Sequence, residues 1–226
     1  MEFDFQERLA ESPLVEKIWW TRTQQAGSFV STAESHWEIV VATVKGQTDI
    51  TIRGPETIAT SADVPAEGEF LGIVFKLGAF MPDLPTSHRL DRNDLPLPLA
   101  AHQSFWLNGS TWEIPNLENA DTFVDRLIRE GLLVIDPVVE ATLQGHPQDL
   151  SLRSIQNHFV RATGLTHNTI QQIDRAKTAM TLLRQGMPIL DTVFEVGYYD
   201  QPHLTRSLKR FVGQTPAQIA QAIWPE

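Results

Sequence analysis

Cysteine is absent from the 226 residues of the sequence. Its absence excludes disulfides, thiolate nucleophiles and zinc or iron–sulfur sites built on cysteine. Long apolar runs are absent as well, since none approaches the ~18 residues that a membrane-spanning helix needs. Residues 1–7 are acidic, which argues against a secretory signal. We therefore expect a cytoplasmic protein that works without a membrane partner.

The motifs of several common chemistries are missing too. The chain has no P-loop, no dinucleotide-binding glycine pattern and no nucleophile elbow. The N-terminal histidines His36, His88 and His102 do not form a compact metal-ligand set, and no pair of carboxylates is placed for acid–base work. We predict no enzymatic activity, no cofactor and no metal. The alternative is a cupin-like, metal-dependent enzyme with an accessory helical domain, which a cluster of histidines and carboxylates inside the sheet domain would reveal.

Positive charge is scarce over the chain as a whole, with 18 Lys and Arg against 28 Asp and Glu and a net charge of −10. The acidity is uneven. Residues 137–226 hold 8 Lys and Arg and 7 Asp and Glu, a balance of +1, whereas residues 1–136 hold 10 and 21, a balance of −11. A negatively charged partner would therefore have to be attracted by local clusters of cations in the C-terminal part.

The N-terminal part is dominated by strand signals. Runs of β-branched or alternating apolar residues predict strands over residues 37–44, 48–53 and 70–77, separated by Gly and Pro turns. Residues 82–117 are rich in proline and polar residues and are predicted as loops and short helices. Short strands between tight turns favour a cupin-like barrel or a sandwich, and we assign residues 1–118 to this β-rich domain.

The pattern becomes helical after residue 118, so residues 119–226 are predicted as an all-α domain. Ser151 is a good N-cap for a helix that Gly164 can end in the left-handed conformation. Apolar residues at spacings of three and four predict a longer helix over residues 166–185. The fold class expected for the whole chain is α+β with two domains.

Two segments of the helical part are alike. Each opens with a cap, Ser151 or Asp200, has an apolar residue four positions later, and ends in a glycine, Gly164 or Gly213. The two caps lie 49 positions apart. A helix of ~20 residues between the two segments would separate them by ~30 Å, close to the ~34–36 Å of one turn of B-DNA. Two short helices on such a spacer could enter successive major grooves.

Residues 197–216 closely resemble the second helix-turn-helix signature of the AraC-type (AraC/XylS) transcription regulators. Weaker matches mark the first unit and the linker helix, at Ser151, Ile155, Phe159, Gly164, Arg175, Ala179 and Leu183. The resemblance covers residues 135–222. It implies a sequence-specific DNA-binding transcription regulator with two helix-turn-helix units joined by a linker helix, and double-stranded DNA as its partner.

The resemblance also implies which residues meet DNA, because the family docks the second helix of each unit in the major groove. The side chains that would contact bases are Arg153, Ser154, Gln156 and Asn157 in the first unit and Gln201, His203, Thr205 and Arg206 in the second. The chemistry is suitable, since Arg can clamp guanine, Gln or Asn can clamp adenine, and Thr can meet the thymine methyl. Phosphate contacts would come from Arg161, Lys209 and Arg210.

The β-rich domain is expected to bind a small-molecule effector, to mediate dimerisation, or both. Trp20, His36 and Trp37 are candidates for an effector pocket, although packing is the usual role of buried tryptophan. A homodimer that reads two half-sites follows only from the resemblance. A protein-interaction module that has lost its DNA affinity stays open as an alternative, because the chain is acidic and Asn157 stands where many family members carry Arg.

Overall fold

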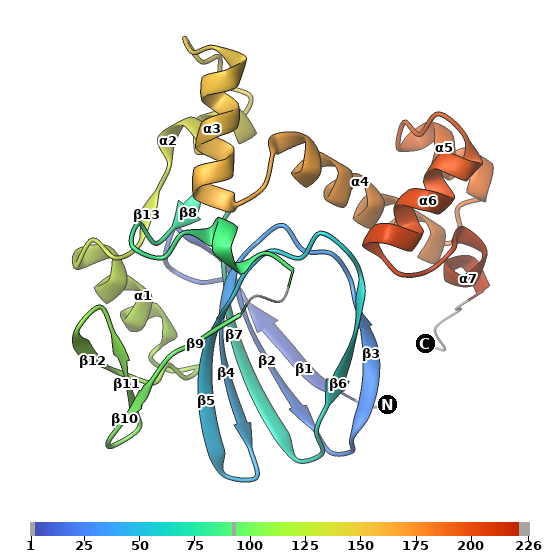
Figure 1. Ribbon diagram of the computed structural model, residues 1–226. Coiled ribbons are helices and arrows are strands. Elements are labelled where there is room, and N and C mark those ends of the chain that lie inside the picture. Colours follow the sequence, from blue (N-terminus) through green and yellow to red (C-terminus); the bar gives the residue numbers. More distant parts are fainter. Residues whose placement is uncertain (1–2, 92–93, 222–226) are drawn as a thin grey trace. The chain divides into compact units, whose positions relative to one another are not determined.

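The computed structural model describes residues 3–91 and 94–221 of the chain (Figure 1). Its contacts divide the chain into two compact units, each of which has its own description below. The first unit consists of Met1–Ser28, His36–Pro55 and Asp63–Thr166. The second consists of Phe29–Ser35, Glu56–Ala62 and His167–Glu226. Two short segments of the N-terminal half therefore belong to the same unit as the last helices.

The first unit is built on an antiparallel sheet of six strands. Their order across the sheet is β1 (Phe3–Arg8), β2 (Val15–Thr23), β7 (Gly68–Phe75), β4 (Glu38–Val44), β5 (Gln47–Arg53) and β9 (Leu95–Pro96). Strands β4, β5 and β7 confirm the three strands predicted from the sequence. The hairpin between β4 and β5 turns at Lys45 and Gly46, both with positive φ, as a two-residue hairpin loop requires.

One face of this sheet forms the core. Ile18, Ile73, Ile39 and Ile52 lie side by side on four neighbouring strands and are all fully buried. β-branched side chains suit this position because they pack well on a pleated surface. Apolar and polar residues alternate on β5, where one face is buried, whereas Val40 on β4 and Val74 on β7 are buried on the opposite face as well.

A three-stranded sheet and a helix extend this core. Strands β10 (Leu99–Ala100), β11 (Ser104–Leu107) and β12 (Ser110–Glu113) precede helix α1 (Ala120–Arg129). The ring of Phe123 on α1 packs against Phe105 and, edge-on, against Trp112. The prediction of loops and short helices for residues 82–117 is wrong here. The strands are too short to show a period, and the informative signal is Asn108-Gly109, the two-residue hairpin turn between β11 and β12.

Two further helices of the first unit sit on a small platform. Strands β8 (Ala79–Phe80) and β13 (Val134–Ile135) pair, and a short 3₁₀ helix, η1 (Thr86–Arg89), follows β8. Helices α2 (Pro137–Leu143) and α3 (Leu152–Thr163) follow β13 in the chain. The hydroxyl of Thr86 donates to the carbonyl of Ala162 at 3.3 Å, so η1 satisfies one of the open carbonyls at the end of α3.

The second unit contains the remaining described helices. These are α4 (His167–Arg184), α5 (Ile189–Glu195), α6 (Gln201–Phe211) and α7 (Pro216–Gln221). The helix predicted over residues 166–185 is α4. Its buried side chains follow helical spacing, at Ile170, Ile173, Ala176, Ala179 and Leu183. Helices α5, α6 and α7 all contact α4, which is therefore the central support of the unit.

A two-stranded sheet from the N-terminal half, β3 (Gly27–Ser31) and β6 (Thr60–Val64), leads into the segments that join these helices. The backbone N–H groups of Ala33 and Ala59 donate to the carbonyls of Phe211 and Arg210, both at 2.7 Å. The Lys177 ammonium on α4 lies 2.6 Å from a Glu34 carboxylate oxygen. The two backbone bonds satisfy carbonyls at the C-terminal end of α6 that a helix leaves open.

The predicted α+β fold class is confirmed, with a β-rich N-terminal region and a helical C-terminal region. The domain boundary predicted between residues 118 and 119 stays a prediction; the compact units follow tertiary contacts, not sequence order. Within the described ranges, no helix is both long and apolar enough to span a bilayer. Over the same ranges, no group of three or more His, Asp and Glu side chains is placed to hold a metal ion.

Candidate nucleic-acid interface

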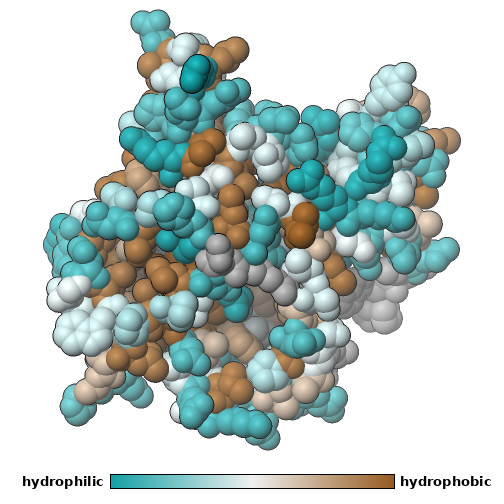
Figure 2. All heavy atoms as spheres, in the orientation of Figure 1, coloured by the Kyte–Doolittle hydropathy of each residue, from teal (hydrophilic) through white to brown (hydrophobic). Residues whose placement is uncertain are grey.

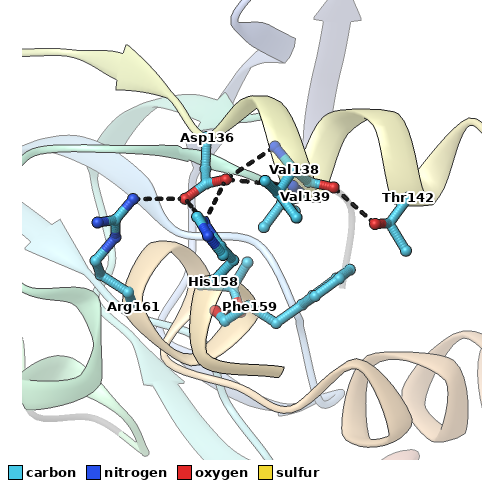
Figure 3. Close-up of polar contacts among 8 residues, drawn as sticks. Asp136, Val138, Val139, Thr142, His158, Phe159 and Arg161 are labelled. Atoms are coloured by element: carbon cyan, nitrogen blue, oxygen red, sulfur yellow. Dashed lines mark hydrogen bonds and ion pairs between the residues drawn. The ribbon is translucent and has the colours of Figure 1, made fainter. Parts of the chain in front are cut away.

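The first helix-turn-helix unit, α2 and α3, is tied together by one buried carboxylate (Figure 3). Asp136 caps α2 by accepting from the backbone N–H groups of Val138 at 3.0 Å and Val139 at 3.3 Å. It also meets the His158 ring nitrogen and the Arg161 guanidinium from α3, each at 2.8 Å. Burial alone would raise the pKa of Asp136, but the hydrogen bonds from His158, Arg161 and the backbone outweigh it and hold the pKa below its usual value.

Helix α3 presents a polar face opposite its buried one. The hydroxyl of Ser151 accepts from the Ser154 backbone N–H at the start of the helix, and Gly164, with φ of 75°, ends it. Both predicted caps are therefore in place. Phe159 and Ala162 face the core. Of the predicted base contacts, Arg153, Gln156 and Asn157 are exposed and Ser154 is half-buried.

Arg161, predicted as a phosphate contact, has a second role that the sequence did not indicate. Its guanidinium pairs with Asp136 and lies 5.7 Å from the centre of the Phe80 ring. The side chain is still 63% exposed. A phosphate contact by Arg161 stays a prediction, and it would have to share the guanidinium with Asp136.

The second helix-turn-helix unit, α5 and α6, has a tight turn between its two helices. Gly197 takes the left-handed conformation, with φ of 73°, after α5. Asp200 then caps α6, because its carboxylate accepts from the His203 backbone N–H at 2.7 Å. Tyr198, between these two residues, is buried; its hydroxyl lies 2.9 Å from that of Ser207, and burial raises its pKa. The buried ring anchors the turn to α6.

Helix α6 also divides into a buried and an outward face. Leu204, Leu208 and Phe211 are buried. The predicted contacts Gln201, Arg206, Lys209 and Arg210 are exposed, whereas His203 and Thr205 are half-buried. The Thr205 hydroxyl donates to the Gln201 carbonyl at 2.9 Å, which leaves its methyl group as the part free to meet a base. The His203 ring stands edge-on to Tyr198.

The charge on α3 and α6 differs from that of the chain. Neither helix contains an Asp or Glu, although the whole chain has 28. α3 carries Arg153 and Arg161, and α6 carries three cations, Arg206, Lys209 and Arg210. Among residues 3–91 and 94–221, no ion pair engages Arg153, Arg206 or Lys209. These cations are therefore available to a polyanion.

The three candidate effector residues do not gather at one point. Trp37 is buried in the core, where its ring stacks on Phe75 with centroids 4.0 Å apart and its N–H donates to the Ala79 carbonyl. Trp20 is half-buried two residues beyond Ile18 on the same face of the sheet, and its N–H donates to Glu69. His36, beside Trp37 in sequence, is half-buried. A pocket lined by these residues stays a prediction.

Replacing Asp200 with alanine is expected to lower the free energy of unfolding by about 1 kcal/mol, the usual loss for an N-cap. The His203 N–H would lose its acceptor, and the first turn of α6, which carries Gln201, would fray. Urea unfolding followed by circular dichroism measures the change. Asp200→Ser, which keeps a capping oxygen, should remain close to the original protein. Equal stability of the alanine and serine variants would contradict the capping role.

Comparison with known proteins points to the same part of the chain. A family model for helix-turn-helix domains matches residues 149–222, which hold every contact residue predicted above. No curated protein matches the sequence. Among solved structures, ToxT from Vibrio cholerae is similar over 96% of this chain and 98% of that chain, at 9% identity and a TM-score of 0.41. ToxT from Vibrio cholerae O395 bound to (E)-4-(8-methylnaphthalen-1-yl)but-3-enoic acid is similar over 97% and 99%, at 8% identity and a TM-score of 0.42.

Proposed function

We propose that this chain, whose residues 149–222 form a helix-turn-helix domain of the AraC type, is a sequence-specific, DNA-binding transcription regulator. One observation carries the proposal. Two short helices, α3 and α6, each expose Arg with Gln or Asn on the outward face and contain no carboxylate, in a chain of net charge −10. Such helices fit the major groove, where Arg pairs with guanine and Gln or Asn with adenine.

In the second helix-turn-helix unit, α5 and α6, we assign the main base contacts to Gln201 and Arg206. Both are exposed on α6, and Gln201 is its first residue, where a recognition helix meets base edges. Lys209 and Arg210, nearer the other end of α6, would hold phosphates and fix the register without reading sequence.

In the first helix-turn-helix unit, α2 and α3, we assign base contacts to Arg153, Gln156 and Asn157, which share the exposed side of α3. Ser154 is half-buried, and its backbone N–H donates to the Ser151 hydroxyl. Its own hydroxyl can still reach a base. On DNA, we propose that the two helices occupy successive major grooves. The 18 residues of α4 span ~27 Å, which leaves the connecting turns to complete one helical repeat.

The proposal is tested by selecting operators from a random duplex pool with the full chain and measuring affinity for the enriched site. Gln201→Ala and Arg206→Ala should each weaken specific binding by about 1–3 kcal/mol, roughly 5- to 150-fold, and relax the preference at one base pair. Lys209→Ala is the matched control on the same helix. It should weaken binding to all sequences alike and lower the slope of log affinity against log salt by about 1.

Two results would contradict the proposal. Folded protein that enriches no site and binds no duplex at low salt would favour a protein-interaction module. If the double variant Gln201→Ala/Arg206→Ala keeps its sequence-specific affinity, Gln201 and Arg206 do not contact bases.

We further propose that the β-rich region regulates DNA binding through a small-molecule effector, through a homodimer, or both, and that the chain works in the cytoplasm without an enzymatic activity of its own. Trp20 is the better-placed of the candidate pocket residues, because it is half-buried beside Glu69 while Trp37 is enclosed by the core. An effector can act only if it binds two arrangements of the protein with different affinity.

A further inference from the structure

Two large apolar side chains stand out in solvent at the N-terminal ends of α3 and α6. Leu152, the first residue of α3, is 80% exposed, and Tyr199, directly before the Asp200 cap of α6, is 91% exposed. Few large apolar side chains in the described part of the chain are as open to water. Figure 2 shows hydrophobic residues among the polar ones at the end of α3 where the helix begins.

The fold does not need either side chain. In the turn before α6, Tyr198 fills the buried position and hydrogen-bonds Ser207, so Tyr199 adds nothing to the packing. On α3, the core contacts come from Phe159 and Ala162, two and three turns beyond Leu152. Single exposed apolar residues are common on protein surfaces, so exposure alone indicates little. The position of these two side chains is informative, because each lies at the N-terminal end of a proposed recognition helix.

The neighbours of these side chains favour DNA over a protein partner. Leu152 adjoins Arg153, and Tyr199 lies two residues before Gln201, so each continues the exposed face assigned above to base contacts. Neither α3 nor α6 contains a carboxylate, and the one beside Tyr199, that of Asp200, accepts from the His203 backbone N–H. The N-terminal residues of a recognition helix are the ones that approach base edges most closely.

We propose that Leu152 and Tyr199 are further DNA contacts, with Leu152 packing on the C5-methyl group of a thymine and Tyr199 donating its phenol hydroxyl to a phosphate oxygen. This inference rests on the proposed DNA-binding function and extends it. The thymine methyl is the one apolar group that a base edge offers in the major groove. A phenol at the mouth of the groove reaches the backbone, where tyrosine is a frequent donor. Leu152 therefore adds sequence preference, and Tyr199 adds affinity for any sequence.

The Leu152 contact is tested by a double-mutant cycle between protein and DNA. Each thymine of the selected operator is replaced in turn by uracil, which removes only the methyl group, and affinity is measured for the original protein and for Leu152→Ala. One methyl group is worth about fourfold in affinity. At one position the original protein should lose about fourfold, whereas Leu152→Ala, already weaker on thymine, should lose nothing more. Leu99→Ala, at an exposed leucine of β10, is the matched control and should respond to uracil as the original protein does.

The Tyr199 contact is tested by Tyr199→Phe, which keeps the ring and removes the hydroxyl. Affinity should fall about fivefold, the value of one hydrogen bond, and equally for the selected operator and an unrelated duplex. Circular dichroism verifies that both variants fold, as expected for exposed side chains.

The outcomes separate this inference from the proposed function. A selected operator at which no thymine couples to Leu152, with Tyr199→Phe binding as the original does, overturns the inference and leaves the regulator intact. Failure to select any operator overturns both.

Discussion

Replacing Asp136 with alanine is expected to lower the free energy of unfolding by about 4 kcal/mol. The side chain is completely buried, and it caps α2 while it binds His158 and Arg161 on α3. The lost cap is worth about 1 kcal/mol, and each charge-assisted hydrogen bond about 1.5 kcal/mol. The Arg161 side chain is 63% exposed and keeps its hydration, so the change does not strand a buried cation, which would cost more.

Asp136→Asn separates the two parts of this effect, because asparagine caps helices as well as aspartate does. The asparagine variant should lose about half as much stability as the alanine variant, through its weaker bonds to His158 and Arg161. Urea unfolding of all three proteins at pH 7 gives the values. Equal losses for both variants would show that the charge, not the cap, carries the whole contribution.

The same carboxylate gives a dependence on pH. Because the pKa of Asp136 in the folded chain lies below its unfolded value of about 3.9, its contribution to stability is complete above that pH. The contribution is lost as the pH falls through the folded pKa. The stability difference between the original protein and Asp136→Asn should therefore shrink as the pH falls below about 4. A difference that grows on acidification below about pH 4 would contradict this sign.

The helical part was predictable because its signals are local. Ser151 and Asp200 both accept the backbone bond expected of an N-cap, and Gly164 and Gly197 both take the left-handed conformation that ends a helix or turn. Each of these interactions spans three or four residues, so the sequence contains both partners. The exposure of Arg153, Gln156 and Arg206 follows from the same periodicity, since the opposite face is apolar.

The role of Asp136 was harder to predict from the sequence, although its capping of α2 has a local signal. An aspartate before Pro137 is a typical helix start, and in the structure Asp136 caps α2. Its bonds to His158 and Arg161 span 22 and 25 residues and depend on how α3 lies against α2. No spacing rule predicts such a contact, so Arg161 was assigned to phosphate alone.

The contacts of the N-terminal segments with the last helices could not be predicted at all. Ala33 and Ala59 donate to carbonyls of α6 across more than 150 positions of sequence, through backbone groups that every residue type carries. Gly213 packs close to the same segments, since a Cβ there would lie 2.7 Å from Val30. Side-chain identity therefore did not indicate that segments of the N-terminal half support the end of α6.

Replacing Gly54 with alanine is expected to lower the free energy of unfolding by about 3 kcal/mol, the upper end for an overpacked site. Gly54 follows β5 and lies against the last residue of η1: a Cβ there would overlap the Arg89 carbonyl and lie 2.7 Å from the Arg89 Cβ. The obstacle is mainly backbone, which cannot rotate away as a side chain can. η1 in turn holds the C-terminal end of α3 through Thr86, so a shift of η1 should also loosen α3.

Gly145→Ala, in the loop between α2 and α3, is the matched control for this change. Gly145 has φ of 74° and open space around its Cα, so alanine there should cost only the conformational penalty of about 1 kcal/mol. Urea unfolding compares the two variants, and amide hydrogen exchange reports on α3, whose protons should exchange faster in Gly54→Ala than in Gly145→Ala. If the two variants are equally stable and α3 is equally protected, Gly54 does not hold η1 against the sheet. A larger loss for Gly54→Ala, together with faster exchange in α3, would show that the segment after β5 supports α3 through η1.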